Sequence, residues 1–521
     1  MELRAFSCIG LLVAFASACG GGGSGPAPGD DGGPDPEPMD PVVVIDRGWE
    51  PCAPHDASMK AGPDCNLYEV PQRWADPASG TLETLVYRWR APEDGRLGQV
   101  WLLDGGPGGT GAGIARPEIV DTFLDAGHDV YVPVPRGSWG SSVLSCDQPG
   151  EPSACRGELA ERVSLAELAA FTTGETARDL AHLLRANADE EVPAALFGSS
   201  YGTYLALRTL QLDVPLAAVV LDGAMTYAPD VWAAGVYRDA LVRGLFDACE
   251  ADPVCAARFS VPVSEARARI ADPTHCPALR EEGPVGALLG ATGLFGIPAV
   301  PLALASRIAR CEEADVDALG PLVGGFGAPP VMDGPGGGGG APPVPASQLN
   351  ATLYNNVVAH DFLVGFDDAE YQAVRAEGET LAYATTTEEA DRFRDLRDAW
   401  PVLDGFAPDP TVPEDAPPTL LLVGALDIQT PPAWTEITEA DLGGQAVRFP
   451  GLGHGVLSSD LQQGSGCAAG IVTAFLADPT LPADDGCAGS EAPDLTGDDD
   501  PRLGQLAFLL FGDDDLWGDD E

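Results

Sequence analysis

The sequence predicts an α/β fold in which a mostly parallel central sheet is flanked by helices. First, apolar runs such as residues 99–103 and 419–424 have the continuous hydrophobic character of parallel strands that are buried on both faces. Second, a Gly-x-Ser-x-Gly motif at residues 198–202 lies between an apolar run and a helical pattern. Third, an aspartate and then a histidine follow later apolar runs, in the chain order Ser, Asp, His.

The motif at residues 198–202 predicts how a serine is presented. The pattern of residues 193–197 predicts a short buried strand, and residues 203–208 continue as a helix. The backbone between them must turn so sharply that only glycine on either side avoids a collision. In a chain with 64 glycines, a purely structural role for the motif is the alternative, and the other residues of the chain have to distinguish the two roles. In the α/β-hydrolase fold this position makes Ser200 the nucleophile and leaves Ser199 without that role.

Chain order predicts the acid and the base of this fold. Residues 419–424 lead to Asp427 at the carboxyl end of a predicted strand, where catalytic groups collect in open α/β sheets. Residues 445–449 predict the next strand, and His454 follows in a glycine-flanked loop. The chain has six histidines, and His454 alone follows Asp427. We therefore expect His454 to take the proton of Ser200 and Asp427 to orient the imidazole.

A glycine-rich loop at residues 104–111 follows the predicted strand 99–103. Such a loop supplies one amide donor to the oxyanion of a tetrahedral intermediate, and the residue after the nucleophile, Tyr201, supplies the other. A phosphate-binding loop is the alternative, but it needs a lysine after its glycines, and the only lysine in the chain is Lys60. The same absence argues against pyridoxal phosphate, and no His-Glu-x-x-His pattern indicates zinc. We therefore expect no cofactor and no metal.

Several segments together resemble the prolyl iminopeptidase and tripeptidyl aminopeptidase branch of the α/β-hydrolases. They are the Ser200 motif and the stretches 105–111, 136–142, 424–431 and 453–455. The resemblance extends over residues 86–235 and 417–487. Members of this branch remove residues or short peptides from free N-termini and use Ser, Asp and His without a metal. The resemblance implies a triad of Ser200, Asp427 and His454 and oxyanion donors at the amides of Gly105, Gly106 and Tyr201.

Two departures from this branch lie near the predicted floor of the site. Asp104 stands where the iminopeptidases carry histidine, and residues 134–135 stand where the family has an Asp-x-Arg-Gly pattern. Neither departure touches the triad, so the peptide specificity can differ while the hydrolytic machinery stays. In the family, acidic cap residues hold the free amino group of the substrate. The conceivable counterparts, none of them preferred, are Asp230, Asp239, Asp247 and Asp361.

The length of 521 residues exceeds the roughly 250 that an α/β-hydrolase core needs, which implies an inserted cap domain. Residues 42–86 are expected to form an N-terminal extension with one disulfide, and a Pro/Gly-rich stretch near 324–345 is expected to be a disordered loop. The predicted organisation is a signal peptide at 1–18, a Gly/Pro/Asp-rich linker at 19–45, the first part of the core at 46–226, a mainly helical cap at 227–416, the second part of the core at 417–490 and an acidic C-terminal tail at 491–521.

The N-terminus predicts export. The apolar run 5–18 is shorter than the about 20 residues of a stable bilayer helix, and it ends in an A-x-A cleavage pattern at residues 16–18. The following Cys19 completes an acceptable bacterial lipobox, and the glycine-rich spacer after it favours lipidation of Cys19. We therefore expect an exported lipoprotein of the cell envelope. The alternative is a secreted or periplasmic soluble protein without an anchor.

The cysteines support export independently. Ten of the twelve remain when Cys8 of the signal and Cys19 are set aside, and an even number in close sequential pairs indicates disulfides in an oxidising compartment. Free thiols are the alternative. The expected pairs are Cys52 with Cys65, Cys146 with Cys155, Cys249 with Cys255, Cys276 with Cys311, and Cys467 with Cys487.

The net charge of −52, from 80 acidic and 28 basic residues, argues against nucleic acid and anionic lipid surfaces as partners. It can attract cationic peptides, including free N-terminal amines, although we expect most carboxylates to serve solubility. The expected partner is a peptide or small-molecule substrate, and membrane contact is expected only through a lipid on Cys19. We expect the protein to act as a monomer.

Three functions remain open. The first is an exported serine aminopeptidase that acts through an acyl-enzyme at Ser200. The second keeps the same triad but hydrolyses small esters or amides, as a carboxylesterase does. The third is a catalytically silent surface binding module, which predicts a lost triad member, and none is lost. The sequence therefore favours the first function.

Overall fold

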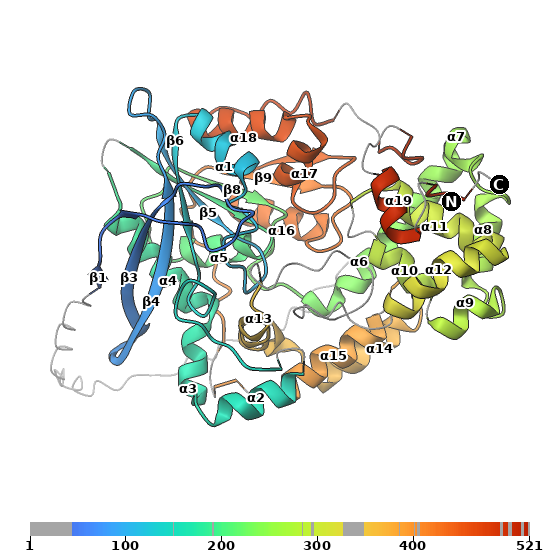
Figure 1. The fold of residues 1–521 in the computed structure, drawn as a ribbon, viewed down its shortest axis with the longest axis horizontal. Helices are drawn as coiled ribbons and strands as arrows, with labels where there is room; N and C mark the ends of the chain where they lie inside the picture. The colour runs from blue at the N-terminus through green and yellow to red at the C-terminus, as the bar shows by residue number, and fades with distance from the viewer. Residues whose placement is uncertain are drawn as a thin grey trace, which may run out of the picture. The chain divides into compact units, whose positions relative to one another are not determined.

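A computed structural model describes residues 44–518, apart from residues 149–150, 190–191, 284, 293–295, 327–348, 385, 401, 404–406, 490–492, 499–502 and 512–514. Figure 1 shows the fold as a ribbon. The predicted signal peptide, Cys19 and most of the predicted linker lie outside the described residues, as do residues 327–345 of the predicted loop.

One central sheet runs through the described part of the chain. Its strands are β1 (Ile45–Asp46), β2 (Glu50–Pro51), β3 (Asp64–Arg73), β4 (Asp76–Trp89), β5 (Gly98–Leu103), β6 (His128–Pro133), β7 (Ala194–Ser199), β8 (Ala218–Asp222), β9 (Thr419–Gly424) and β10 (Gln445–Phe449). The strand order is β1-β3-β4-β6-β5-β7-β8-β9-β10, with β2 paired to β3. All neighbours from β6 to β10 are parallel, and the pairs before them are antiparallel.

This mostly parallel sheet confirms the predicted α/β-hydrolase fold class. The apolar runs 99–103, 193–197, 419–424 and 445–449 form β5, β7, β9 and β10, with bounds that agree to within two residues. Parallel strands need a crossover connection, and helices supply most of these connections here. The helices of the core are α1 (Pro117–Asp125), α4 (Thr173–Ala186), α5 (Tyr201–Leu210), α16 (Pro432–Leu442), α17 (Val456–Gln463) and α18 (Cys467–Ala477).

Both faces of the parallel strands are buried by these helices (Figure 1). In β5, Val100 and Leu102 pack in the cluster that contains side chains of α1, α17 and α18. Trp101 and Leu103 pack on the opposite face, in the cluster that contains side chains of α4 and α5. Successive side chains of a strand point to opposite faces, so burial of both faces explains the continuous apolar run.

The segment expected as an N-terminal extension is part of the sheet. β3 and β4 form a long antiparallel pair, from Asp64 opposite Arg88 to Pro71 opposite Thr81. The end of β4 pairs with β6, which joins the antiparallel strands to the parallel ones. In β3, buried residues alternate with partly exposed ones. The segment is therefore integrated into the core sheet rather than appended to it.

The chain between β8 and β9 is mainly helical. Its first group consists of η2 (Val231–Ala233), α6 (Ala234–Ala251), α7 (Pro253–Ala256), α8 (Val263–Ala271), α9 (Pro277–Glu282), α10 (Val285–Thr292), α11 (Ala299–Arg310) and α12 (Glu313–Phe326). Its second group consists of α13 (Ala351–Val357), η4 (Val358–Phe362), η5 (Leu363–Gly365), α14 (Asp368–Gly378) and α15 (Thr386–Ala399). Among the described residues, no helix combines the length and the apolar character that crossing a bilayer requires.

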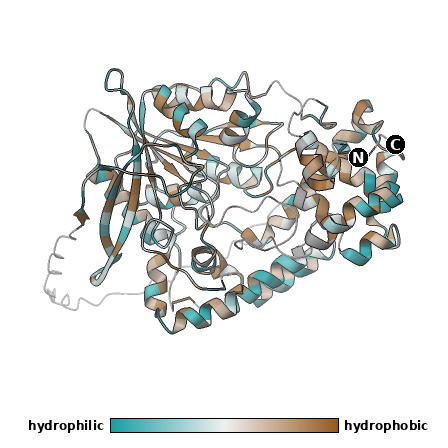
Figure 2. Ribbon diagram, in the orientation of Figure 1, coloured by the Kyte–Doolittle hydropathy of each residue, from teal (hydrophilic) through white to brown (hydrophobic). Residues whose placement is uncertain are grey.

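Each helical group has its own apolar core. One cluster contains buried side chains of α6 to α12. A second contains side chains of α13 to α15, together with those of three short helices that precede β7 in the chain, α2 (Pro152–Ala160), α3 (Leu165–Leu168) and η1 (Ala169–Phe171). In Figure 2, the ribbons of α14 and α15 are coloured largely as hydrophilic residues, although both helices also contribute side chains to this cluster. The cap is thus assembled partly from residues that precede the nucleophile strand.

Part of the predicted acidic tail packs against the first helical group. It contains α19 (Leu503–Phe511), whose buried residues belong to the same cluster as α11 and α12. Trp517 is also buried there, and its Nε1 donates to Thr496 O at 2.9 Å. Arg307 Nε donates to Leu516 O at 2.9 Å. These contacts form because apolar residues are interspersed among the carboxylates of the tail.

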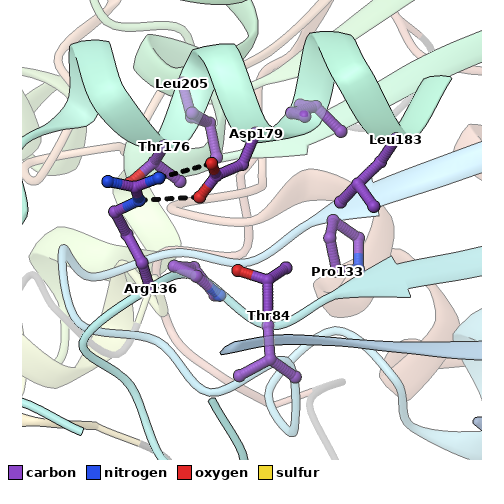
Figure 3. A pocket seen from close by; sticks show the side chains of 10 residues that line it. Thr84, Pro133, Arg136, Thr176, Asp179, Leu183 and Leu205 are labelled. Carbon is purple, nitrogen blue, oxygen red and sulfur yellow. Dashed lines mark hydrogen bonds and ion pairs between the residues drawn. The ribbon is translucent and has the colours of Figure 1, made fainter. Parts of the chain in front are cut away.

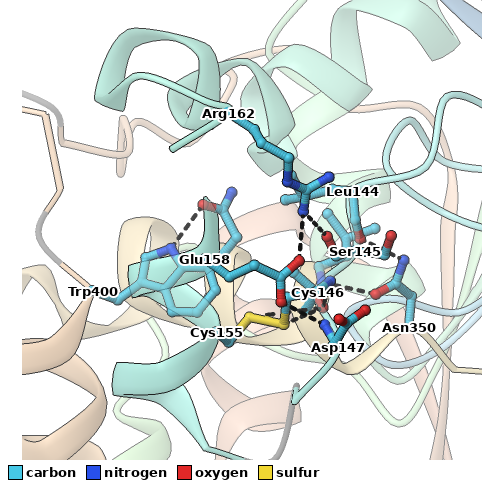
Figure 4. The surroundings of a disulfide bond; sticks show 12 residues. Leu144, Ser145, Cys146, Asp147, Cys155, Glu158, Arg162, Asn350 and Trp400 are labelled. Atoms are coloured by element: carbon cyan, nitrogen blue, oxygen red, sulfur yellow. Dashed lines mark hydrogen bonds and ion pairs between the residues drawn. A yellow bond between two sulfur atoms is a disulfide. The ribbon is translucent and has the colours of Figure 1, made fainter. Parts of the chain in front are cut away.

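The structure joins the ten cysteines expected to pair in five disulfides, with the pairing that the sequence predicts. Figure 4 shows the surroundings of the bond between Cys146 and Cys155. Cys146 N donates to Thr352 Oγ1 at 3.2 Å, and Asn350 Nδ2 donates to Leu144 O at 2.9 Å. The bond therefore lies where the loop after β6 meets the start of α13.

Arg136 is an internal anchor of the core. Its side chain is fully buried, and it forms a bidentate ion pair with Asp179 of α4, with Nε 2.7 Å from Oδ2. Its other N–H groups donate to the carbonyl oxygens of Pro71, Gln72 and Ala170. Figure 3 shows this pair beside a small cavity of about 10 Å³, which holds none of the predicted catalytic residues. The pair links β3, the loop after β6 and α4.

We expect Asp179→Ala to lower the free energy of unfolding by about 3–5 kcal/mol, because it removes the closest counter-charge of the buried Arg136 guanidinium and leaves Glu175, whose carboxylate is 3.8 Å away. Urea denaturation followed by circular dichroism measures this. Asp121→Ala is the matched control, because Asp121 is 46% exposed and pairs with Lys60 at the surface, where ion pairs contribute little. Equal losses in the two variants would contradict the anchoring role of the buried pair.

Candidate active site

Ser200 lies in the tight turn between β7 and α5. Its φ is +56° and its ψ is −125°, a conformation that non-glycine residues rarely adopt. Space explains the glycines on either side: a Cβ on Gly198 would lie 2.5 Å from Gly202 O, and a Cβ on Gly202 would lie 2.1 Å from Leu103 O. The hydroxyl is thus presented at the carboxyl edge of the sheet, by a backbone strain of the kind that functional sites retain.

Asp427 and His454 are in direct contact at the same edge. Asp427 follows β9 and His454 follows β10, which is the neighbouring strand, and His454 Nδ1 lies 2.9 Å from Asp427 Oδ2. The side chain of Asp427 is 2% exposed and that of His454 is 16% exposed. Asp427 Oδ1 also accepts from the amides of Gln429 and Thr430 at 2.8 and 2.9 Å. The carboxylate is therefore held independently of the histidine and leaves His454 Nε2 as the proton acceptor.

Thr430 is a residue of the site to which the sequence analysis assigned no role. Its Oγ1 donates to Asp427 Oδ2 at 2.7 Å and lies 3.1 Å from His454 Nδ1. The side chain is 4% exposed. The available signal was the Asp-x-x-Thr spacing, because an aspartate accepts readily from amides two and three residues further on. Thr430 thus fixes the rotation of the carboxylate that faces the histidine.

The end of β8 lies between Ser200 and the pair formed by Asp427 and His454. Ser200 N donates to Asp222 O at 2.9 Å. A Cβ on Gly223 would lie 3.1 Å from Asp427 Oδ2 and 3.4 Å from His454 Cε1. The structure therefore brings the three predicted catalytic residues to one place. Ser200 and His454, both described residues, share no hydrogen bond, and such contacts often form only when substrate binds.

The loop after β5 is organised by the buried carboxylate of Asp104. Its Oδ1 accepts from Gly105 N at 2.9 Å, and its Oδ2 accepts from Gly111 N at 2.9 Å and from Gly113 N at 3.3 Å. A Cβ on Gly105 would lie 3.3 Å from Ser200 Cβ. The loop therefore passes directly beside the nucleophile, and one acidic side chain holds three of its amides.

This geometry corrects one expected oxyanion donor. The Gly105 amide is used by Asp104 and is not available to a substrate. The amides of Gly106 and Tyr201 have no acceptor among the described residues, so they stay the expected donors. Spacing along the chain did not distinguish Gly105 from Gly106, because the difference lies in where the Asp104 carboxylate points.

Three titratable groups at the site have shifted pKa values. Burial by itself lowers the pKa of His454, but the carboxylates of Asp427 and Asp222 outweigh burial and raise that pKa above its ordinary value of 6.5. Burial raises the pKa of Asp104 to about 6, against the amide hydrogen bonds that lower it. Burial likewise raises the pKa of Asp222 to about 6. Asp104 and Asp222 therefore change charge near pH 6, whereas the pKa of His454 lies above 6.5.

The cap carboxylates considered for binding an amine already have partners in the protein. Asp239 and Asp247 form ion pairs with Arg243 and Arg267. Asp230 accepts from the indole N–H of a tryptophan at 2.8 Å. None of these three carboxylates contacts a residue of the predicted triad.

Asp361 is connected to the predicted machinery by hydrogen bonds. It is 6% exposed and accepts from Thr173 N and Thr173 Oγ1, each at 2.9 Å. Thr173 Oγ1 in turn lies 2.9 Å from Tyr201 OH. Asp361 is therefore linked by hydrogen bonds, through Thr173, to Tyr201, the residue that follows the nucleophile.

Residues 391–487, which include Asp427 and His454, match the family described as TAP-like protein. No curated protein matches the chain. Similar solved structures include an esterase from Exiguobacterium antarcticum (12% identity, TM-score 0.34, covering 76% of this chain and 96% of that one). They also include an esterase from a Rhodococcus species (15%, 0.35, 76% and 95%) and a proline iminopeptidase from Mycobacterium smegmatis (14%, 0.34, 76% and 95%). Sequence identities and TM-scores this low carry no information about the reaction.

We expect the kcat/KM of hydrolysis to fall on the acid side with a slope steeper than one proton. As the pH falls, His454 becomes protonated and cannot take the Ser200 proton, and its raised pKa makes this loss begin above pH 6.5. Asp104 and Asp222 are protonated near pH 6 and then accept fewer amide hydrogen bonds. A pH profile of kcat/KM measures this, and a limb of slope one centred below pH 6.5 would contradict it.

We expect Asp104→Asn to lower kcat by about tenfold to a hundredfold, less than the 10²–10³ of a lost oxyanion donor. The reason is that an amide NH₂ would face one or more of the N–H groups that the carboxylate now binds. Asp129→Asn is the control, because Asp129 is a buried aspartate that accepts from a backbone amide, Ala91 N, at the far end of β6. Steady-state kinetics on both variants checks this, and equal kcat values would refute it.

Proposed function

We propose that this α/β-hydrolase is an exported serine aminopeptidase that removes residues or short peptides from free N-termini. The observation that carries the proposal is the 2.9 Å contact between His454 Nδ1 and Asp427 Oδ2 at the sheet edge where Ser200 is presented. Three residues that are far apart in the chain have the types and the order that nucleophilic acyl transfer needs.

In the proposed reaction His454 takes the proton of Ser200 as Oγ attacks the carbonyl carbon of the scissile bond. The amides of Gly106 and Tyr201 donate to the oxyanion of the tetrahedral intermediate. His454 then gives its proton to the leaving amine, and the acyl-enzyme remains on Ser200. Water, activated by the same imidazole, releases the acid product. Asp427 keeps the tautomer correct and stabilises the imidazolium in both halves.

Three observations support the aminopeptidase proposal and export. The match to the TAP-like family over residues 391–487 covers the strand and loops that carry Asp427 and His454. The net charge of −52 favours the approach of a substrate with a free ammonium group. The five disulfides support an oxidising compartment, since such bonds are rare in reducing ones. Lipidation of Cys19 stays a prediction.

A carboxylesterase or amidase with the same triad is the second candidate. One observation favours it: the four cap carboxylates considered for amine recognition are engaged by the protein itself. A substrate ammonium group would have to compete with these partners. An ester substrate carries no such group and would need only the triad and the oxyanion donors.

We expect Ser200→Ala to abolish both hydrolysis and labelling by a fluorophosphonate probe, because the covalent intermediate forms on Oγ. Ser199→Ala is the matched control: Ser199 is the last residue of β7 and pairs with Asp222 in the sheet, so this variant should keep both activities. The measurement is fluorophosphonate labelling of the purified parent and of both variants, read on a gel. A labelled and active Ser200→Ala variant would overturn the proposal.

Substrate pairs separate the two candidates. Aminoacyl and tripeptidyl nitroanilides with free N-termini are compared with the same compounds acetylated at the N-terminus, and with short-chain nitrophenyl esters. A higher kcat/KM for the free N-termini supports the aminopeptidase. Equal rates on free and acetylated compounds, with faster ester hydrolysis, would support the esterase instead.

A further inference from the structure

Asp222, the last residue of β8, has no part in the reaction described so far. It is 1% exposed, and its two carboxylate oxygens accept from Val456 N at 2.7 Å and from Leu457 N at 3.0 Å. These are the first two amides of α17, which begins two residues after His454. The first amides of a helix have no partner within the helix, and that end of the helix favours a negative charge. The carboxylate therefore fastens the loop that carries His454.

The main chain of the same residue holds the nucleophile. Asp222 O accepts from Ser200 N at 2.9 Å, and Asp222 pairs with Ser199 in the ladder between β7 and β8. One residue thus binds the turn of Ser200 through its backbone and the loop of His454 through its side chain. The two catalytic residues are 254 positions apart in the chain, and Asp222 contacts the segments of both.

The neighbouring Gly223 keeps the link short. Its φ is +67°, and a Cβ there would lie 2.6 Å from Thr430 Oγ1 and 3.4 Å from His454 Cε1. Glycine therefore lets the end of β8 approach the triad without a side chain in between. The carboxylate of Asp222 can then bind the two amides that follow the histidine loop.

We propose that Asp222 is a positioning residue that sets the place of His454 relative to Ser200, an inference that rests on the proposed serine hydrolase function. Asp222 acts through His454 and through the first amides of α17. A displacement of about 1 Å in such a constellation can cost on the order of a hundredfold in rate.

A merely structural helix cap would hold the fold without acting on the histidine, and charge distinguishes the two roles. The charged groups that act on His454 are Asp427, from the loop after β9, and Asp222, from β8. Those that act on Asp222 are His454 and Asp427. Removing the negative charge at position 222 should lower the pKa of His454. The variant should therefore keep its remaining activity to a lower pH than the parent does.

The test compares Asp222→Asn with Asp460→Asn in the full protein. Asp460 is a matched control, because it is 2% exposed, lies on the same helix α17 and accepts from Ala468 N at 3.0 Å, away from the triad. For Asp222→Asn we expect kcat to fall about tenfold to a hundredfold, with KM within about threefold of the parent. The rate of fluorophosphonate labelling should fall by a similar factor, and the acid limb of kcat/KM should move to lower pH. For Asp460→Asn none of these should change.

Two outcomes would overturn the inference: kinetics of Asp222→Asn equal to those of the control, or a loss of activity with an unmoved acid limb. If Asp222→Asn does not fold, Asp222→Glu replaces it, since that variant keeps the charge but shifts the carboxylate. It should lower kcat and leave the acid limb in place, and full activity would overturn the inference. An unlabelled parent would instead refute the proposed function, because the probe reports on Ser200 directly.

Discussion

Main-chain segments approach each other at the carboxyl edge of the sheet more closely than any side chain would allow. A Cβ on Gly202 would lie 2.1 Å from Leu103 O, and one on Gly424 would lie 2.1 Å from Gly453 O. The first contact packs the start of α5 against the end of β5, and the second packs the end of β9 against the histidine loop. These two contacts place the nucleophile turn beside the loop after β5, and the histidine loop beside the end of β9, where the acid loop begins.

Buried carboxylates then order the loops that leave this edge. Asp104 holds the glycine-rich loop, Asp222 holds the start of α17, and Asp427 holds the turn that contains Thr430. Loops lack the regular ladders that satisfy backbone amides, and a carboxylate has two oxygens that can accept several N–H groups. Burial raises the pKa of Asp104 and of Asp222 to about 6, so this way of ordering a site also makes it sensitive to acid.

The hydrophobic runs and the chain order predicted β5, β7, β9, β10 and the three residues Ser200, Asp427 and His454, which the structure brings to one edge of the sheet. Strands buried on both faces are marked by composition alone, whereas β3 is buried only at alternate positions and was not distinguished from an extension. The roles of Asp104 and Asp222 had no local signal either. Among 80 acidic residues, nothing in the sequence marks the few that are buried.

The sequence by itself determined the fold class, the turn at Ser200 and the order of the reacting residues, because apolar runs and glycine spacings act over a few neighbouring positions. Only the tertiary structure decided which amides stay free and which carboxylates organise the site. Asp222 meets Val456 across 234 positions, and the Gly105 amide is lost to the oxyanion because of the direction in which Asp104 points. Such pairings depend on distance and orientation in space, and hydrogen bonds, which act over about 3 Å, leave no periodic trace in a chain.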